Sequence, residues 1–167
     1  MARNIEIKAR IASVEAVLAR ATSIADGAPV VIDQDDTFFA VAHGRLKLRR
    51  FADGSAELIQ YHRDDSADAK ASDYVRVPVA DALAEALTRA CGTRGRVRKR
   101  RLLLMAGQTR MHLDRVDGLG DFLEFEVVLR DGQSDADGTA IAERLMTALA
   151  IAPEDRLAGA YLDLAAG

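Results

Sequence analysis

The chain has 167 residues, with 26 acidic and 23 basic side chains, a net charge of −3 and a pI near 5.6. This length fits one domain, and a single cysteine, Cys91, excludes a disulfide framework or a CxxC metal pair. The balanced charge and the absence of tryptophan argue against a general nucleic-acid-binding protein. No apolar run approaches the ~20 residues of a membrane helix. The chain also starts without the apolar segment of a signal peptide, so we expect a cytoplasmic protein with no membrane partner.

Alternating polar and apolar residues predict most of the elements in the first half of the chain. Ser13 is a candidate cap for the first helix. The polar run Asp33–Asp36 is typical of a turn, and Pro78 is expected to stop a strand. In chain order we therefore expect a strand over 4–10, a helix over 14–25, and strands over 30–32, 37–42, 45–51, 56–63 and 72–77.

The second half of the chain continues the same succession. A helix is expected over 81–90 with Gly92 as its C-cap. Three strands follow, over 97–105, 108–116 and 122–129, and a helix over 139–150. Pro153 is expected in the first turn of a last short helix that ends near Ala165.

These elements amount to about eight strands in mostly hairpin-like succession, with helices at the start, middle and end. The chain shows no βαβ alternation and no internal repeat. The sequence therefore predicts an α+β fold with one antiparallel sheet, either a barrel or a curved sheet.

Several predicted strands carry ionisable side chains at every second position, and two explanations are open. One is that these residues form the wet face of an antiparallel sheet. The other is that the strands close into a barrel with the charged faces inside and the helices over the apolar outer faces. The cations on these faces are Lys8, Arg10, Arg45, Lys47, Arg49, Arg63, Lys99 and Arg101, with Arg110 as a further candidate. The carboxylates are Glu6, Asp114, Glu124 and Glu126.

A charged interior of this kind has a characteristic ligand chemistry. Guanidinium and ammonium groups bind phosphate oxygens, and clustered carboxylates bind hard cations such as Mg²⁺ or Mn²⁺. A polyphosphate chelated by a divalent metal would use both sets. The strand parity leaves His62 and Arg63 on opposite faces, and parity with Tyr61 favours Arg63 inside.

Four segments together resemble the CYTH superfamily, which contains the class IV adenylate cyclases and the thiamine triphosphatases. They are IEIKAR at 5–10, GRLKLR at 44–49, VRKRR at 97–101 and HLDRVDGLGDFLEFE at 112–126, the last being the most specific. The resemblance covers nearly the whole chain, taken as one domain over 1–167, and is closest to the class IV cyclase branch. It implies an eight-stranded antiparallel barrel with flanking helices around a tunnel that binds a triphosphate with Mg²⁺ or Mn²⁺.

The same resemblance implies roles for individual residues. Glu6 and Glu124 would be metal ligands, and Asp114 a ligand or a positioning base. The residues expected to contact phosphate are Lys8, Arg49, Lys99 and Arg101. The expected catalytic set consists of Glu6, Lys8, Asp114 and Glu124. The family signature E-x-E-x-K has Asn4 in place of its first Glu here. Either Glu126 compensates as a further metal ligand, or the metal number or the activity is altered.

Three functions follow as hypotheses. The first is an adenylate cyclase that converts ATP to 3′,5′-cyclic AMP and pyrophosphate. The second is a triphosphatase acting on inorganic triphosphate, thiamine triphosphate or a nucleoside triphosphate, and the third is a non-catalytic polyphosphate- or nucleotide-binding module. The basic run 94–101 is expected to point Lys99 and Arg101 inward and Arg98 and Arg100 outward, rather than to bind nucleic acid. The sequence leaves the oligomeric state open, and the resemblance suggests a homodimer.

Overall fold

A computed structural model describes residues 2–63 and 65–165, with the side chains of residues 2 and 63 left out of the description. The strands are β1 (Ala2–Arg10), β2 (Val30–Phe39), β3 (Arg45–Phe51), β4 (Ala56–Arg63), β5 (Lys70–Val79), β6 (Thr93–Ala106), β7 (Thr109–Val116), β8 (Gly120–Val128) and β9 (Arg156–Leu157). The helices are α1 (Val14–Ile24), α2 (Leu83–Cys91), α3 (Asp135–Ala148) and α4 (Tyr161–Ala165), with a 3₁₀ turn, η1 (Pro153–Asp155), before β9. None of the helices in the described part is long and apolar enough to cross a membrane.

The first eight strands close into an antiparallel barrel, as expected from the sequence. Their order around the barrel is β1, β8, β7, β6, β2, β3, β4 and β5, and β5 pairs again with β1. Closure uses only the first half of β1, because β5 pairs with residues 2–6. The short strand β9 pairs with Lys8 and Ala9 where β5 has diverged.

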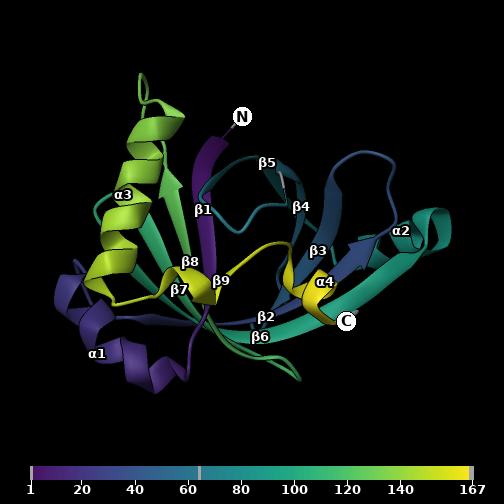
Figure 1. Cartoon of the computed structure of the whole chain (residues 1–167). Coiled ribbons are helices and arrows are strands. Elements are labelled where there is room, and N and C mark those ends of the chain that lie inside the picture. Colours follow the sequence, from purple (N-terminus) through teal and green to yellow (C-terminus); the bar gives the residue numbers. More distant parts are fainter. Residues whose placement is uncertain (1, 64, 166–167) are drawn as a thin grey trace.

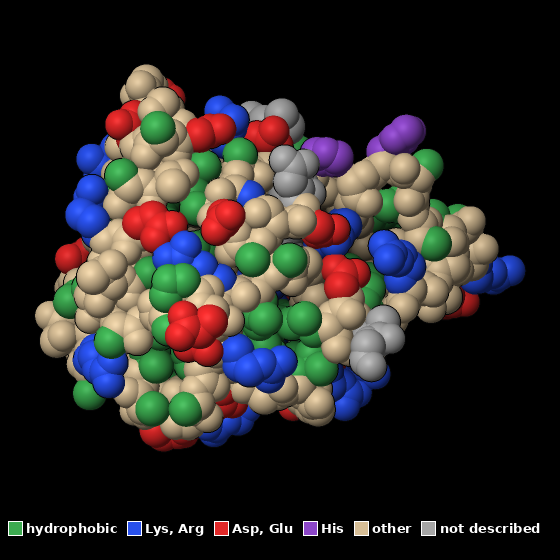
Figure 2. All heavy atoms as spheres, viewed as in Figure 1, with side chains coloured by type: hydrophobic (Ala, Val, Ile, Leu, Met, Phe, Trp, Pro, Cys, Tyr) green, Lys and Arg blue, Asp and Glu red, His purple; other side chains and the backbone are tan. Residues whose placement is uncertain are grey.

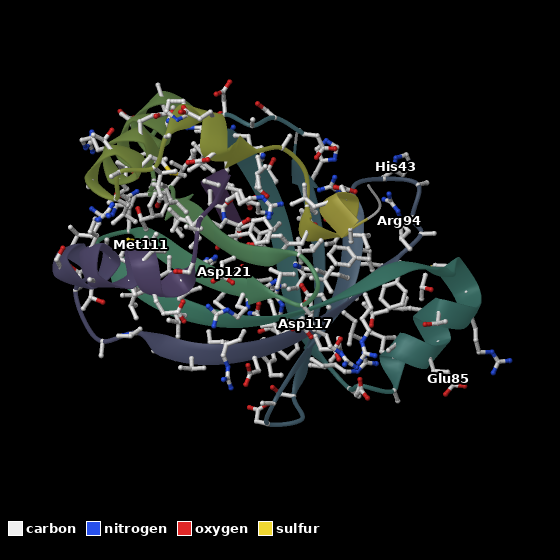
Figure 3. The ribbon with its side chains drawn as sticks, turned by 60° about the horizontal axis from the view of Figure 1, so that its bottom comes forward. His43, Glu85, Arg94, Met111, Asp117 and Asp121 are labelled. Carbon is white, nitrogen blue, oxygen red and sulfur yellow. The ribbon has the colours of Figure 1, made fainter. Side chains whose placement is uncertain are left out.

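The outward faces of β1, β7 and β8 are apolar and are covered by α1 and α3 (Figure 1). Ile5, Ile7 and Ala9 of β1 are at most 1% exposed and belong to one core cluster with Met111 and residues of α1 and α3. Figure 3 shows Met111 on the side of the sheet where α1 lies. Since the outer faces are apolar and covered here, the charged faces of these strands line the interior, and the wet-face interpretation is wrong for them.

The other two helices pack on two smaller apolar clusters. Helix α2 packs on a cluster formed by Phe39, Leu48 and Ala56. Tyr161 of α4 packs against Phe38 and Phe122, with 4.9 Å between the ring centroids of Phe122 and Tyr161. On the outer surface, acidic and basic side chains are interspersed (Figure 2).

The structure corrects the prediction of two short strands around a turn at Asp33–Asp36, because β2 runs unbroken from Val30 to Phe39. Ion pairs with the neighbouring strand outweigh the turn propensity of these residues. Asp33 binds Arg100 on the outer face at 2.9 Å, and Asp35 binds Arg96 there. Asp36 points the other way, into the barrel. The neighbouring strands therefore hold extended a run that favours turns in isolation.

Three further boundaries differ from the predicted ones. Strand β5 continues through Pro78, which is possible because residues 75–79 pair with β4 alone and form an open edge. Helix α3 starts at Asp135 instead of Thr139, since Ser134 and Asp137 form a capping box. The predicted last helix is divided into η1, β9 and α4, and this division brings Tyr161 to the barrel interior.

Candidate functional site

The barrel interior contains a cavity of about 100 Å³ that is partly open to solvent. Inward-facing side chains of all eight barrel strands line it, together with Tyr161 of α4. Each strand delivers side chains to the cavity at every second position. The cavity therefore collects charge from strands that are far apart in the sequence.

Four cations and one carboxylate form one wall of this cavity, which we call the basic wall: Lys47, Arg49, Lys99, Arg101 and Asp36. Arg49 donates two hydrogen bonds of 2.7 Å to the two carboxylate oxygens of Asp36. Lys47 Nζ lies 2.9 Å and Lys99 Nζ 3.5 Å from Asp36 Oδ2.

Burial and neighbouring charges shift the pKa values of the basic wall. Burial lowers the pKa of Lys99 to about 7 although Asp36 opposes this, and burial together with Arg49 lowers the pKa of Lys47 to about 8. Burial alone would raise the pKa of Asp36, but Arg49, Lys47 and Lys99 hold it well below its ordinary value. Asp36 is thus ionised at neutral pH, where Lys99 is close to its midpoint.

Three carboxylates and a histidine gather on a second wall, the acidic wall: Glu6, Glu124, Glu126 and His112. Glu6 and Glu126 are directly opposite across β1 and β8. Ligand atoms of His112, Glu124 and Glu126 lie within 4.8 Å of one another. This set fits a hard divalent cation, since Mg²⁺ and Mn²⁺ prefer carboxylate oxygens and Mn²⁺ also accepts imidazole.

Cations neighbouring the acidic wall keep its carboxylates ionised. Lys8 Nζ lies 3.2 Å from Glu124, and Arg110 lies 3.3 Å from Glu126. Burial raises the pKa of Glu124, yet Lys8, His112 and Arg101 hold it well below the ordinary value. The pKa of Glu126 is likewise lowered, against the effect of burial, by His112 and Arg101 and by its partner Arg110.

Neutral oxygens next to the acidic wall complete the cavity lining. Asn4 and Ser72 are opposite across β1 and β5, and both side chains line the cavity. Each residue is at most 2% exposed, and Asn4 Oδ1 and Ser72 Oγ have no hydrogen-bond partner within residues 2–63 and 65–165. Buried polar atoms are ordinarily satisfied, so these two are available to a metal, a water or a bound molecule.

Asp114 is placed differently from the expected ligand or base. It is fully buried behind Arg101, which donates hydrogen bonds of 2.7 and 2.6 Å to its two oxygens. The Tyr161 hydroxyl donates a further bond of 2.7 Å. Although burial raises it, the pKa of Asp114 is about 2 because of Arg101. Its carboxylate is thus committed to holding Arg101 and Tyr161.

Two of the expected cations, Arg10 and Arg45, lie outside the described cavity lining. Arg10 lies at the barrel end, with its guanidinium 4.8 Å from the Phe122 ring centroid and a bond to the Leu119 carbonyl. Arg45 binds Asp65 and Asp163 near a separate small pocket. The side chain of Arg63 lies outside the described residues, so its expected place is not tested.

The basic run 94–101 divides as its alternation predicts. Lys99 and Arg101 are buried and line the cavity, whereas Arg98 and Arg100 are exposed on the outer face. Arg98 lies 3.6 Å from Asp35, and Arg100 binds Asp33. The outward arginines are therefore balanced by the outward acids of β2.

Sequence analysis missed two residues of the site. Asp36 was hidden in the supposed turn, although the alternation of Gln34, Asp36 and Phe38 is a strand signal that would have placed it inside. Tyr161 has Lys8 Nζ 4.0 Å and Lys99 Nζ 5.2 Å from its ring centroid. No local pattern indicates this residue, because its place depends on the path of the chain after α3.

Comparisons with known proteins agree with this architecture. A family model described as "CYTH domain" matches residues 2–161. No curated protein is similar enough in sequence to count as a match. Among solved structures, the PH1012 protein from Pyrococcus horikoshii superposes with a TM-score of 0.86 at 22% identity, covering 96% of this chain and 98% of its own.

Two further structures carry names that mention an activity. A protein from Vibrio parahaemolyticus, described as a candidate adenylate cyclase, has a TM-score of 0.77 at 19% identity, with 98% of each chain covered. A candidate adenylyl cyclase from Hippeastrum, described as having a dominant triphosphatase activity, has a TM-score of 0.65 at 15% identity, covering 90% of this chain and 89% of its own. At these identities the likeness shows the fold alone.

Proposed function

The chain belongs to the CYTH domain family, and we propose that it is a metal-dependent enzyme acting on a triphosphate held inside the barrel. The observation that carries this proposal is the meeting of the basic wall and the acidic wall in one cavity. A metal-chelated triphosphate is the ligand whose charges match both walls. Either wall alone would be explained by a simple anion or a simple cation.

The basic wall would bind the phosphates. Lys47, Lys99 and Arg101 point into one cavity from β3 and β6, so they can neutralise several phosphate oxygens at once. Arg101 is held in place by Asp114, which explains why that carboxylate is buried behind it. Phosphoryl and nucleotidyl transfer depend mainly on such positioning and charge stabilisation.

The acidic wall would hold the metal, with Glu6, Glu124 and Glu126 as the carboxylate ligands and His112 beside them. When bound, a divalent cation there supplies Lewis-acid stabilisation of phosphate oxygens. The orphaned oxygen of Asn4 is a neutral donor at the position where the family signature has a Glu. Compensation by Glu126, which lies opposite Glu6, fits this arrangement.

Adenylate cyclase is the activity we favour. The cavity lining also includes uncharged side chains, among them Phe38, Ile59 and Tyr61, which a nucleoside could contact. In that reaction the ribose 3′-oxygen bonds to the α-phosphorus, the bond to the bridging oxygen breaks, and pyrophosphate leaves. The hydroxyl proton passes to water, and the basic wall stabilises the charge on the departing pyrophosphate.

Triphosphatase activity is the alternative, and the Hippeastrum neighbour supports considering it. The same cavity would then position water at the terminal phosphorus. The two activities differ in which oxygen attacks, and hence in the depth at which the triphosphate binds.

A product assay separates the possibilities. The protein is incubated with ATP, GTP, thiamine triphosphate or inorganic triphosphate, each with Mg²⁺ or Mn²⁺, and the products are resolved by chromatography. Cyclic AMP with pyrophosphate supports the cyclase, whereas ADP or orthophosphate supports the triphosphatase. Binding without any turnover would leave only a nucleotide- or polyphosphate-binding module and refute the enzyme.

A further inference from the structure

We propose that Asp36 is a positioning residue for triphosphate binding, whose carboxylate holds three phosphate-binding cations in one converging arrangement. An acid beside an anion-binding wall is unexpected, because it repels the anion. Its presence is explained if the wall cannot keep its shape or charge without it. This inference rests on the proposed function only in assuming that the cavity binds a triphosphate.

The position of Asp36 in the sheet suits this role. Strand β2 lies between β3 and β6, the two strands that carry the basic wall. Asp36 is directly opposite Arg49 on β3, and it reaches Lys47 on β3 and Lys99 on β6. A single carboxylate on the middle strand therefore links side chains from both of its neighbours.

The contacts of Asp36 fix the orientation of these side chains. Both of its oxygens accept from the Arg49 fork at 2.7 Å, which fixes the guanidinium plane. Asp36 is 1% exposed and Arg49 is 6% exposed, so solvent does not compete for the pair. Flexible lysine side chains lose much conformational freedom when they are ordered, and their contacts with Asp36 meet this cost before a ligand arrives.

Asp36 also keeps the basic wall charged. The charged groups nearest to it are Lys47 and Arg49 on β3 and Lys99 and Arg101 on β6, and the neutral phenol of Tyr161 on α4 faces Lys99. Burial, Arg49, Arg101 and Lys47 lower the pKa of Lys99 to about 7, and Asp36 is the strongest influence that opposes them, with Asp114 of β7 as a further carboxylate near the lysine. Without the Asp36 carboxylate, the lysine would be mostly neutral at neutral pH and would lose its attraction for phosphate.

The test compares Asp36→Asn with Asp35→Asn, a matched control on the outer face of the same strand, where Asp35 binds Arg96. Binding of inorganic triphosphate with Mg²⁺ is measured by calorimetry from about pH 6 to about pH 9. We expect Asp36→Asn to weaken binding about tenfold or more at neutral pH, because the wall loses both order and charge. The pH at which affinity declines should also move to lower values, whereas Asp35→Asn should keep the wild-type affinity and profile.

Asp36→Glu tests the arrangement without changing the charge, and it remains informative if Asp36→Asn does not fold. Its carboxylate lies one methylene further out, so we expect weaker binding with the wild-type pH profile. Equal or tighter binding by Asp36→Asn, or wild-type affinity in Asp36→Glu, would overturn the inference. Absence of binding by the wild-type protein would refute the proposed function and this inference together, whereas wild-type binding with unaffected variants refutes the inference alone.

Discussion

Replacing Lys99 by Met should stabilise the fold and weaken triphosphate binding. The Lys99 side chain is 3% exposed, and burial lowers its pKa from 10.5 to about 7. The folded chain therefore binds fewer protons than the unfolded chain between these two values. The resulting penalty on stability is complete below about pH 7 and disappears as the pH rises through about 10.5.

The size of the effect follows from this shift in the pKa of Lys99. At about 1.4 kcal/mol per unit, it corresponds to a penalty of about 5 kcal/mol on the free energy of unfolding below pH 7. Methionine fills a similar volume without charge, but Asp36 loses one of its partners, 3.5 Å away. We therefore expect a net gain of about 2 kcal/mol near pH 6, within the range seen when buried charges are replaced by apolar groups.

Urea unfolding near pH 6 and near pH 10 measures the gain, with Arg98→Met on the outer face as the control. The gain from Lys99→Met should shrink at the higher pH, where the wild-type lysine is already neutral. Calorimetry with inorganic triphosphate should show that Lys99→Met lowers the affinity about tenfold or more, because one hydrogen bond to a charged group contributes about that much. Arg98→Met should change the affinity little. Lower stability of Lys99→Met near pH 6, or equal losses of affinity in the two variants, would refute this reasoning.

The remaining predictions concern the acidic wall, the support of Arg101 and the helix packing. Glu6→Gln and Glu124→Gln should each abolish metal-dependent turnover, while circular dichroism shows a folded protein. The control Glu85→Gln, on the exposed face of α2 (Figure 3), should leave turnover unchanged. Activity of Glu6→Gln or Glu124→Gln at saturating metal would contradict their assignment as metal ligands. Asp114→Asn should cost about 3 kcal/mol in urea unfolding, because Arg101 loses its buried partner. The pKa of Asp114 is lowered from 3.8 to about 2, so its contribution to the free energy of unfolding is complete above about pH 4 and is lost as the pH falls through about 2. If Asp114→Asn retained the wild-type pH dependence of stability, Asp114 would not be the cause of that dependence. Gly138→Ala should destabilise the protein by about 1–3 kcal/mol in thermal unfolding, because the new Cβ would lie 2.5 Å from a side-chain carbon of Ile5. This is expected even though alanine usually favours helices. A stabilised variant would show that α3 can shift at no cost.

The candidate site was predictable wherever alternation along a strand was clear. Lys8, Lys99 and Arg101 were expected inside from parity, and the structure places all three in the cavity lining. Arg10 followed the same parity but lies at the barrel end, because β1 extends past the cavity there. Alternation determines the face of a strand on which a residue lies, but not its height along the barrel.

Other parts of the site depended on contacts between segments distant in the sequence. Asp36 looked like a turn residue because its neighbours are turn formers, and only pairing with β3 and β6 holds it in a strand. Asp114 looked like a ligand because it is an inward acid, yet Arg101 and Tyr161 use both of its oxygens. Which partners a buried carboxylate binds depends on through-space distances, and a local sequence pattern does not contain them.

By itself, the sequence determined the antiparallel α+β class, the eight-stranded barrel through its family motifs, and the set of inward charges on most strands. These properties follow from period-2 patterning and turn chemistry, which act over a few residues. Only the tertiary structure decided which charges share a wall, which carboxylate holds an arginine and which carboxylates gather beside His112. The physical reason is that electrostatic partnership in a buried cavity depends on through-space distance and desolvation, and both arise only once the barrel closes.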